Sequence, residues 1–429
     1  MIQTVENIGE KLISMLTYDA SQPLIFSSGL FLFLFAGFLF FYGFTRRAPI
    51  ARIVYVILFS LYFYYKSSGI YFLLLVFASV SDYWIAHAIY KVRTQRAKYW
   101  LVGLSILVNL GMLGYFKYTN FLIEIANNLF GQGFLNFQNI FLPVGISFFV
   151  FQSMSYTIDI CRGQLKPLNN WADYLFYLSF FPQLVAGPIV RAKDFIPQIR
   201  QNPLRVTREM FGMGVFLILI GLFKKAVISD YISLNFVDRI FDEPLLYSGF
   251  ECLMGIYGYA LQIYCDFSGY SDMAIGIALL LGFRFPKNFD APYKSATITE
   301  FWRRWHISLS TWLRDYLYIS LGGNRKGRIR TYFNLLVTML LGGLWHGAAV
   351  RFILWGALHG IALALHKLWL SVVPGSKATG AEMRWFWRIP GIFFTFNLVC
   401  FGWLMFRAES MKTVQLMLHQ IFTNFNPSV

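Results

Sequence analysis

IFSSGLFLFLFAGFLFFYGF, residues 25–44, carries no charged side chain and matches the ~20 residues that an α-helix needs to cross the ~30 Å hydrocarbon core of a bilayer. Runs of this kind recur along the 429-residue chain, which is 57% hydrophobic and 19% aromatic but only 14% charged. Soluble domains usually carry more charged residues than this. The sequence therefore predicts an all-α, polytopic membrane protein.

The apolar runs divide the chain into candidate membrane spans. They cover residues 25–44, 51–66, 69–88, 99–116, 210–228, 250–283, 331–349, 352–371 and 389–407. With further crossings between residues 117 and 190, we expect roughly 10–12 transmembrane helices, together with re-entrant and interfacial helices.

The region from 117 to 190 is less regular than the rest. Proline and glycine in PVGIS and PQLVAGPI interrupt two of its apolar pieces. One crossing with re-entrant segments fits this region, and so do three short crossings. Broken backbone at membrane depth must be covered by protein or line a water-filled cavity, so we expect this region to line a cavity.

The formal net charge of +16 would suggest nucleic acid as the partner of a soluble protein, but here the basic residues gather between apolar spans. Arg46, Arg47 and Arg52 follow the first span, and four more basic residues lie between 91 and 98. Cytoplasmic loops are rich in Lys and Arg, so this pattern puts the N-terminus outside. We expect a retained first helix, membrane lipid around the protein and no nucleic-acid partner.

The sequence contains no internal repeat, low-complexity stretch or Pro-rich linker, so we expect one membrane-embedded domain over residues 1–429. Its four cysteines are scattered without metal-ligand spacing, and we expect no metal site. Gly-x-Ser-x-Gly, Walker, dinucleotide-binding and HExxH motifs are also absent from the sequence. Their absence weakens the hydrolase, nucleotide-dependent and zinc-protease alternatives.

Two histidines stand in segments suited to a bilayer. Thr297 and Glu300 have capping-box spacing, which predicts a helix from about Ile298 through the tryptophan-rich segment WRRWHISLSTW. Trp302 and Trp305 share one face of that helix, and His306 falls at its edge. Such a helix would lie at the cytoplasmic interface or dip into the protein, and the alternative is a simple interfacial anchor.

His346 lies ~15 residues along the predicted span 331–349, which at ~1.5 Å per residue is about two thirds of the way across. A charged group at this depth costs ~2.5–3.5 kcal/mol, so an ionisable residue there usually faces a cavity or a partner. Gly342, Gly343 and Gly347 remove side-chain bulk and would let a substrate approach. The alternative is a neutral imidazole bonded to a neighbouring helix.

The predicted span 250–283 carries Gln262, Asp266 and Tyr270 at successive i, i+4 positions. They would form the polar wall of a cavity, with Asp266 able to orient a histidine, or they would make interhelical hydrogen bonds. A continuous helix of this length would measure ~50 Å, so we expect it to tilt or to break near Ser268 and Gly269.

With these residues the chain resembles the membrane-bound O-acyltransferase family, in the branch typified by bacterial alginate O-acetyltransferases. The core motifs span residues 143–410. They are PVGISFFVFQSMSYTIDICRG (143–163), FFPQLVAGPIVR (180–191), YCDFSGYSDMAIG (264–276), NFDAPYKSATITEFWRRWHISLSTWLRDYLYISLGGNR (288–325), GGLWHG (342–347) and FGWLMFRAES (401–410).

The resemblance implies tilted helices around a central tunnel, where a cytoplasmic thioester meets an acceptor from the opposite side. It puts the family's catalytic histidine at His346 and a second active-site position at His306. The residues that we assign to the substrate-binding wall of the tunnel are Trp302, Trp305, Gln262, Asp266, Tyr270, Gly343 and Trp345.

The resemblance also implies an O-acyltransferase in the cytoplasmic membrane of a bacterium. It would move an acetyl group from acetyl-CoA or another acyl thioester, with no bound cofactor, to an exported polysaccharide or to an extracytoplasmic partner protein. His346 would act as general base, and His306 would orient the donor or steady the developing oxyanion.

Two alternatives stand beside this hypothesis. D-Alanyl transfer from a carrier protein to teichoic acid uses a related scaffold. A transporter would also explain intramembrane carboxylates and broken helices, although the chain lacks the repeated halves of many transporters.

Overall fold

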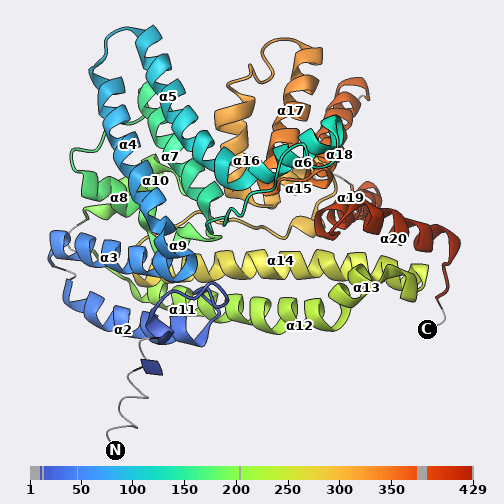
Figure 1. Ribbon diagram of the computed structural model, residues 1–429, viewed down its shortest axis with the longest axis horizontal. Coiled ribbons are helices and arrows are strands. Elements are labelled where there is room, and N and C mark those ends of the chain that lie inside the picture. Colours follow the sequence, from blue (N-terminus) through green and yellow to red (C-terminus); the bar gives the residue numbers. More distant parts are fainter. Residues whose placement is uncertain (1–9, 12–13, 46, 202–203, 374–383, 428–429) are drawn as a thin grey trace, which may run out of the picture. The chain divides into compact units, whose positions relative to one another are not determined.

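The structure is a computed structural model that describes residues 10–11, 14–45, 47–201, 204–373 and 384–427. These residues form helices and connecting loops, with no strand among them (Figure 1). Arg46, which entered the charge argument, lies outside the described residues. The all-α architecture predicted from the apolar runs is confirmed.

The chain folds as two compact units, which comprise residues 1–218 with 273–285 and residues 219–272 with 286–429. In the first unit lie α2 (Gly29–Thr45), α3 (Pro49–Ser68), α4 (Phe72–Lys91), α5 (Gln95–Leu113), α6 (Thr119–Phe130), α7 (Ile146–Cys161), α8 (Trp171–Ser179), α9 (Phe181–Leu184), α10 (Ala192–Ile199) and most of α11 (Arg208–Leu222). In the second lie α12 (Asp230–Ile232), α13 (Asp238–Asp242), most of α14 (Gly249–Leu280), α15 (Ile298–Arg304), α16 (Ile307–Trp312), α17 (Arg328–His346), α18 (Val350–Val372), α19 (Trp385–Arg407) and α20 (Met411–Thr423). The single domain expected over 1–429 stays a prediction.

Five helical segments of the described chain are long and apolar enough to cross a membrane. They are Pro49–Lys91, Gln95–Phe130, Arg208–Asp242, Val350–Val372 and Trp385–Arg407. The chain is thus a polytopic membrane protein. The larger number of crossings and their arrangement around a tunnel stay predictions.

The two segments that proline and glycine interrupt, PVGIS and PQLVAGPI, pack against each other in the first unit. Gly145, in PVGIS, has a left-handed φ of 75°, and a Cβ atom there would lie 2.1 Å from the main-chain oxygen of Leu184, in PQLVAGPI. Only glycine allows the two backbones to approach so closely. The glycine that breaks the apolar pattern in PVGIS therefore allows a close contact with PQLVAGPI.

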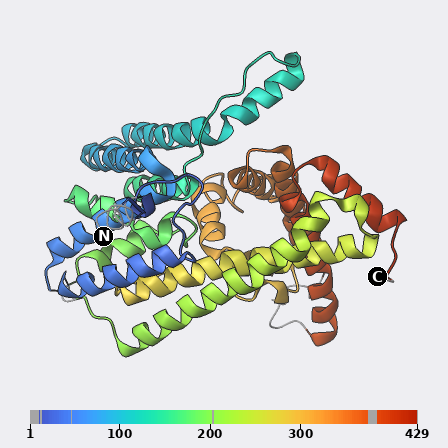
Figure 2. The ribbon, with the colours of Figure 1, turned by 60° about the horizontal axis from the view of Figure 1, so that its bottom comes forward.

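Helix α14 is continuous from Gly249 to Leu280, and the break considered near Ser268 and Gly269 does not occur. Figure 2 shows it, in yellow, as one long helix. In the second unit the segment 219–242 runs along it, and ion pairs and hydrogen bonds between side chains join the two. These contacts between helices satisfy polar groups that lipid would leave unpaired.

Helices α17 and α18 pack closely enough to require small residues. A Cβ atom at Gly356 of α18 would lie 2.3 Å from the main-chain oxygen of Met339 on α17. Small residues at such contacts let helix backbones meet in membrane proteins. This helix pair carries His346 at the end of α17 and holds it against α18.

We expect Gly356→Ala to destabilise the protein, because the methyl group meets a backbone atom that moves only if α17 and α18 separate. Overpacking of this kind costs about 1–3 kcal/mol. Thermal unfolding in detergent measures the effect. Gly103→Ala on α5 is the control, since a Cβ atom there meets nothing within 4 Å. An unchanged unfolding temperature for Gly356→Ala would contradict the packing argument.

Candidate active site

The predicted helix through the tryptophan-rich segment begins where expected but breaks at His306. Thr297 caps it by accepting the Glu300 N–H at 3.1 Å, and Glu300 in turn accepts the Ala296 N–H. α15 ends at Arg304, and His306 adopts a left-handed backbone with φ 42° and ψ 56° before α16 begins. The sequence prediction of one continuous helix is therefore wrong at this residue.

The break has its cause in the loop before α15. The Asn288 carbonyl accepts the Ile307 N–H at 2.9 Å, and the Asp290 N–H donates to the Arg304 carbonyl at 2.9 Å. A continuous helix would need the Ile307 N–H and the Arg304 carbonyl for its own i to i−4 bonds. These hydrogen bonds to the loop offset the free-energy cost of the left-handed conformation, which is of order 1–3 kcal/mol for a non-glycine residue.

The His306 side chain is only 1% exposed. Its Nδ1 lies 3.2 Å from the side-chain oxygen of Asn288, and the ring of Phe267 packs edge-on against it at 4.6 Å between centroids. Burial lowers the pKa of His306 well below its usual value, and His346 acts in the same direction. The imidazole is therefore neutral at neutral pH.

His346 is the last residue of α17 and is half-buried. α17 begins earlier than the predicted span and ends at His346, so this residue lies at the end of the helix. Its depth in the membrane stays a prediction. Its ring meets three aromatic rings edge-to-face, at 4.9–5.2 Å between centroids. They belong to Trp345, Trp355 and Phe406.

The ring of Trp345 contacts the rings of both His306 and His346. Its ring centroid lies 4.9 Å from that of His346 and 6.2 Å from that of His306. Residues that stand forty positions apart in the sequence thus share one site within the second unit.

Tryptophans from several helices wall this site. Trp302 meets Trp355 and His359 edge-to-face, at 5.7 and 5.2 Å. Trp305 lies against Trp403 of α19 at 4.9 Å. These contacts place a wall of aromatic side chains around the two histidines.

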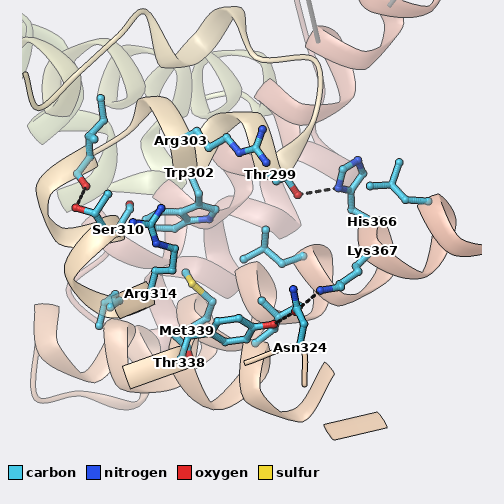
Figure 3. A pocket seen from close by; sticks show the side chains of 17 residues that line it. Thr299, Trp302, Arg303, Ser310, Arg314, Asn324, Thr338, Met339, His366 and Lys367 are labelled. Atoms are coloured by element: carbon cyan, nitrogen blue, oxygen red, sulfur yellow. Dashed lines mark hydrogen bonds between the residues drawn. The ribbon is translucent and has the colours of Figure 1, made fainter. Parts of the chain in front are cut away.

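A cavity of about 740 Å³ lies beside these walls, and Trp302 and Ile307 form part of its lining (Figure 3). Cationic side chains also line it, from Arg303, Arg314 and Lys367. Lys367 donates to the side-chain oxygen of Asn324 at 2.5 Å. Arg314 also pairs with Asp315 at 2.6 Å. The cavity thus has a mostly apolar lining that includes Trp302 and carries cationic side chains, which suits a ligand with both an apolar part and phosphate.

Of the residues assigned to a tunnel wall, Trp302 lines this cavity, whereas the other six and both histidines lie outside its lining. Trp305, Trp345 and Gly343 belong to the packing around the histidines. Tyr270 is buried within α14.

Gln262 and Asp266 face the segment 223–237. Gln262 donates to Ser233 at 2.8 Å, and Asp266 pairs with Lys225 at 2.6 Å. The suggestion that Asp266 orients a histidine is therefore wrong, because the face of α14 that carries it meets a lysine instead. The side chain that contacts the ring nitrogen of His306 is that of Asn288.

Sequence reasoning missed Asn288 because it stands in a loop without periodicity, eighteen residues before His306. It also missed the cationic side chains of the cavity, Arg303, Arg314 and Lys367. The only available signal was the position of Asn288 at the start of the motif NFDAPY.

Comparison with protein families decides the class. The family model described as MBOAT, membrane-bound O-acyltransferase family, matches residues 164–409, which include both histidines and the whole cavity lining. The chain belongs to the membrane-bound O-acyltransferase family. It is therefore an O-acyltransferase, and the class predicted from its motifs is confirmed.

Relatives of this O-acyltransferase act on different acceptors, according to their names. It is 44% identical to a probable alginate O-acetylase of Azotobacter vinelandii, over 93% of this chain and 78% of that one. It is 37% identical to the peptidoglycan O-acetyltransferase of Helicobacter pylori, over 91% and 78%. It is 31% identical to the teichoic acid D-alanyltransferase of Streptococcus thermophilus, over 74% and 77%.

Proposed function

We propose that this O-acyltransferase moves an acetyl group from a cytoplasmic thioester, such as acetyl-CoA, to a hydroxyl group on the opposite side of a bacterial cytoplasmic membrane. The acceptor is an exported polysaccharide or an extracytoplasmic partner protein that relays the group. The N-terminus lies outside. The observation that supports this proposal most is the meeting of His306 and His346 at Trp345, inside aromatic walls and beside a cation-lined cavity.

In the proposed reaction, His346 is the general base. Its neutral imidazole takes the proton of the acceptor hydroxyl while the oxygen attacks the thioester carbonyl carbon. The new C–O bond forms, the C–S bond breaks, and the departing thiolate receives the proton from the imidazolium. His306 orients the donor or steadies the developing oxyanion, and the surrounding tryptophans keep water away from the acyl group.

The donor enters through the cation-lined cavity. Arg303 lines it with an exposed guanidinium, and no carboxylate of the described chain forms an ion pair with it. Hydrogen bonds to charged groups contribute about 1.5–3 kcal/mol, and guanidinium suits phosphate through its paired donors. A phosphate-bearing donor such as acetyl-CoA fits this lining.

Arg303→Ala should raise the KM for acetyl-CoA by about tenfold and leave kcat nearly unchanged, because it removes binding that ground state and transition state share. Steady-state transfer of labelled acetyl groups by membranes measures both constants. Arg96→Ala on α5 is the matched control, since Arg96 is an exposed arginine outside the cavity lining. Equal KM values for Arg303→Ala and wild type would exclude Arg303 from donor binding.

The O-acetyl content of surface polymers in cells with and without the protein tests the function itself. Cells that lack the protein are expected to lose polymer acetylation, and unchanged acetylation would refute the proposal.

D-Alanyl transfer remains the second candidate because of the similarity to a teichoic acid D-alanyltransferase. Labelled acetyl and D-alanyl donors, offered separately to membranes, distinguish the two. The family assignment favours acyl transfer over transport.

A further inference from the structure

The hydrogen bonds of the Asn288 side chain determine which ring nitrogen of His306 carries a proton. Asn288 is 1% exposed and lies between α14 and α15. Its side-chain oxygen accepts from the Ser308 N–H at 3.2 Å and from the Ser308 hydroxyl at 2.9 Å, while its amide nitrogen donates to Ser271 at 3.0 Å. The same oxygen lies 3.2 Å from Nδ1 of His306.

These partners fix which end of the Asn288 amide faces His306. A main-chain N–H can only donate, so the atom beside the Ser308 N–H is the amide oxygen and not the nitrogen. An amide oxygen can only accept. The Nδ1 atom of His306, which contacts that oxygen, must therefore carry a proton.

The other ring nitrogen follows from this assignment. A neutral imidazole carries one N–H, so Nε2 of His306 holds a lone pair and accepts hydrogen bonds. Nε2 is buried and has no hydrogen-bond partner among the residues that the structure describes. A buried polar atom left without a partner is costly, and each such atom in a native protein needs an explanation, such as a catalytic role or a bound water or ion.

We infer that Asn288 is a positioning residue that fixes His306 as the Nδ1–H tautomer and presents Nε2 to the substrates as a hydrogen-bond acceptor. This inference rests on the proposed acyl transfer and sharpens it. In this tautomer, neutral His306 has no Nε2 proton to donate to an oxyanion. It orients a substrate by accepting a hydrogen bond from a substrate O–H or N–H group other than the reacting hydroxyl, whose single proton passes to His346.

Nitrogen NMR of the full-length protein with ¹⁵N-labelled histidine tests the tautomer without any substrate. The His306 signals are assigned by their loss in His306→Gln. We expect a protonated Nδ1 and an unprotonated Nε2 in the wild type and in Ser271→Ala, which keeps the Asn288 oxygen in place. A protonated Nε2 in the wild type would overturn the inference.

Activity gives the second test. Asn288→Leu removes the acceptor oxygen and should lower kcat by about 10²-fold or more, because a wrong histidine tautomer is costly in catalysis. Asn288→Asp keeps an oxygen at the same place and should retain kcat within about tenfold. A loss in Asn288→Asp as large as in Asn288→Leu would contradict the inference.

Asn127→Leu is the matched control, because Asn127 is also a buried asparagine that holds loop backbone, at Leu135 of the first unit. Thermal unfolding of each variant separates loss of fold from loss of positioning.

The proposed function and the proposed role of Asn288 fail on different results. If the wild type shows the expected tautomer but transfers no acetyl group, the proposed function fails and the role of Asn288 in fixing His306 stands.

Discussion

Replacing His346 by alanine should lower the rate of acyl transfer by about 10²–10⁴-fold, the usual contribution of a general base. The imidazole lies where the side chains of Trp345, Trp355 and Phe406 meet. None of these three aromatic side chains can take a proton from a hydroxyl at neutral pH. These three neighbours therefore cannot replace the lost base.

Labelled acetyl transfer by membranes measures this effect, together with the amount and the unfolding temperature of the inserted protein. His419→Ala is the matched control, because His419 is exposed on α20 and its ring contacts Thr423 of the same helix. A correctly inserted His346→Ala protein that acetylates polymers at the wild-type level would remove His346 from the mechanism.

His306→Asn should lower kcat by about 10²-fold while the protein stays folded. Asparagine tolerates a left-handed backbone better than most residues, so it suits the φ of 42° at this position. It keeps hydrogen-bonding groups but has no basic nitrogen and no ring to reach the place of Nε2. The variant therefore separates the imidazole chemistry from the backbone strain.

The kcat of purified protein and its unfolding temperature measure this effect. His87→Asn on α4 is the control, since the His87 ring hydrogen-bonds to the Tyr83 carbonyl of its own helix. Full activity of His306→Asn would show that position 306 needs hydrogen bonding and not basicity. In a double variant with His346→Ala the losses should not add, because both histidines act in one step.

The sequence predicted the membrane class and both histidines for different reasons. Apolar run length is a local property, and it predicted α18 and α19 within a few residues. The cap at Thr297 is local as well. His346 and His306 stood out because ionisable groups are rare in such segments, and the family motifs pointed to the same two residues.

Sequence periodicity failed where long-range contacts compete with local preference. The break at His306 arises from hydrogen bonds to a loop eighteen residues away, so no helical pattern in WRRWHISLSTW could reveal it. The same holds for Asp266, whose spacing on α14 is helical but whose partner is Lys225 on another segment. An i, i+4 pattern shows which residues share a face, but not what that face meets.

The sequence by itself determined that this chain is an all-α membrane O-acyltransferase with two candidate histidines, because hydropathy, caps and motifs reside in contiguous residues. Only the tertiary structure decided that Trp345 joins those histidines, that Asn288 holds one of them, and that Arg303 and Lys367 line one cavity. These facts depend on which helix faces meet. That choice is made by packing between segments far apart in the chain, where local sequence carries no record of the partner.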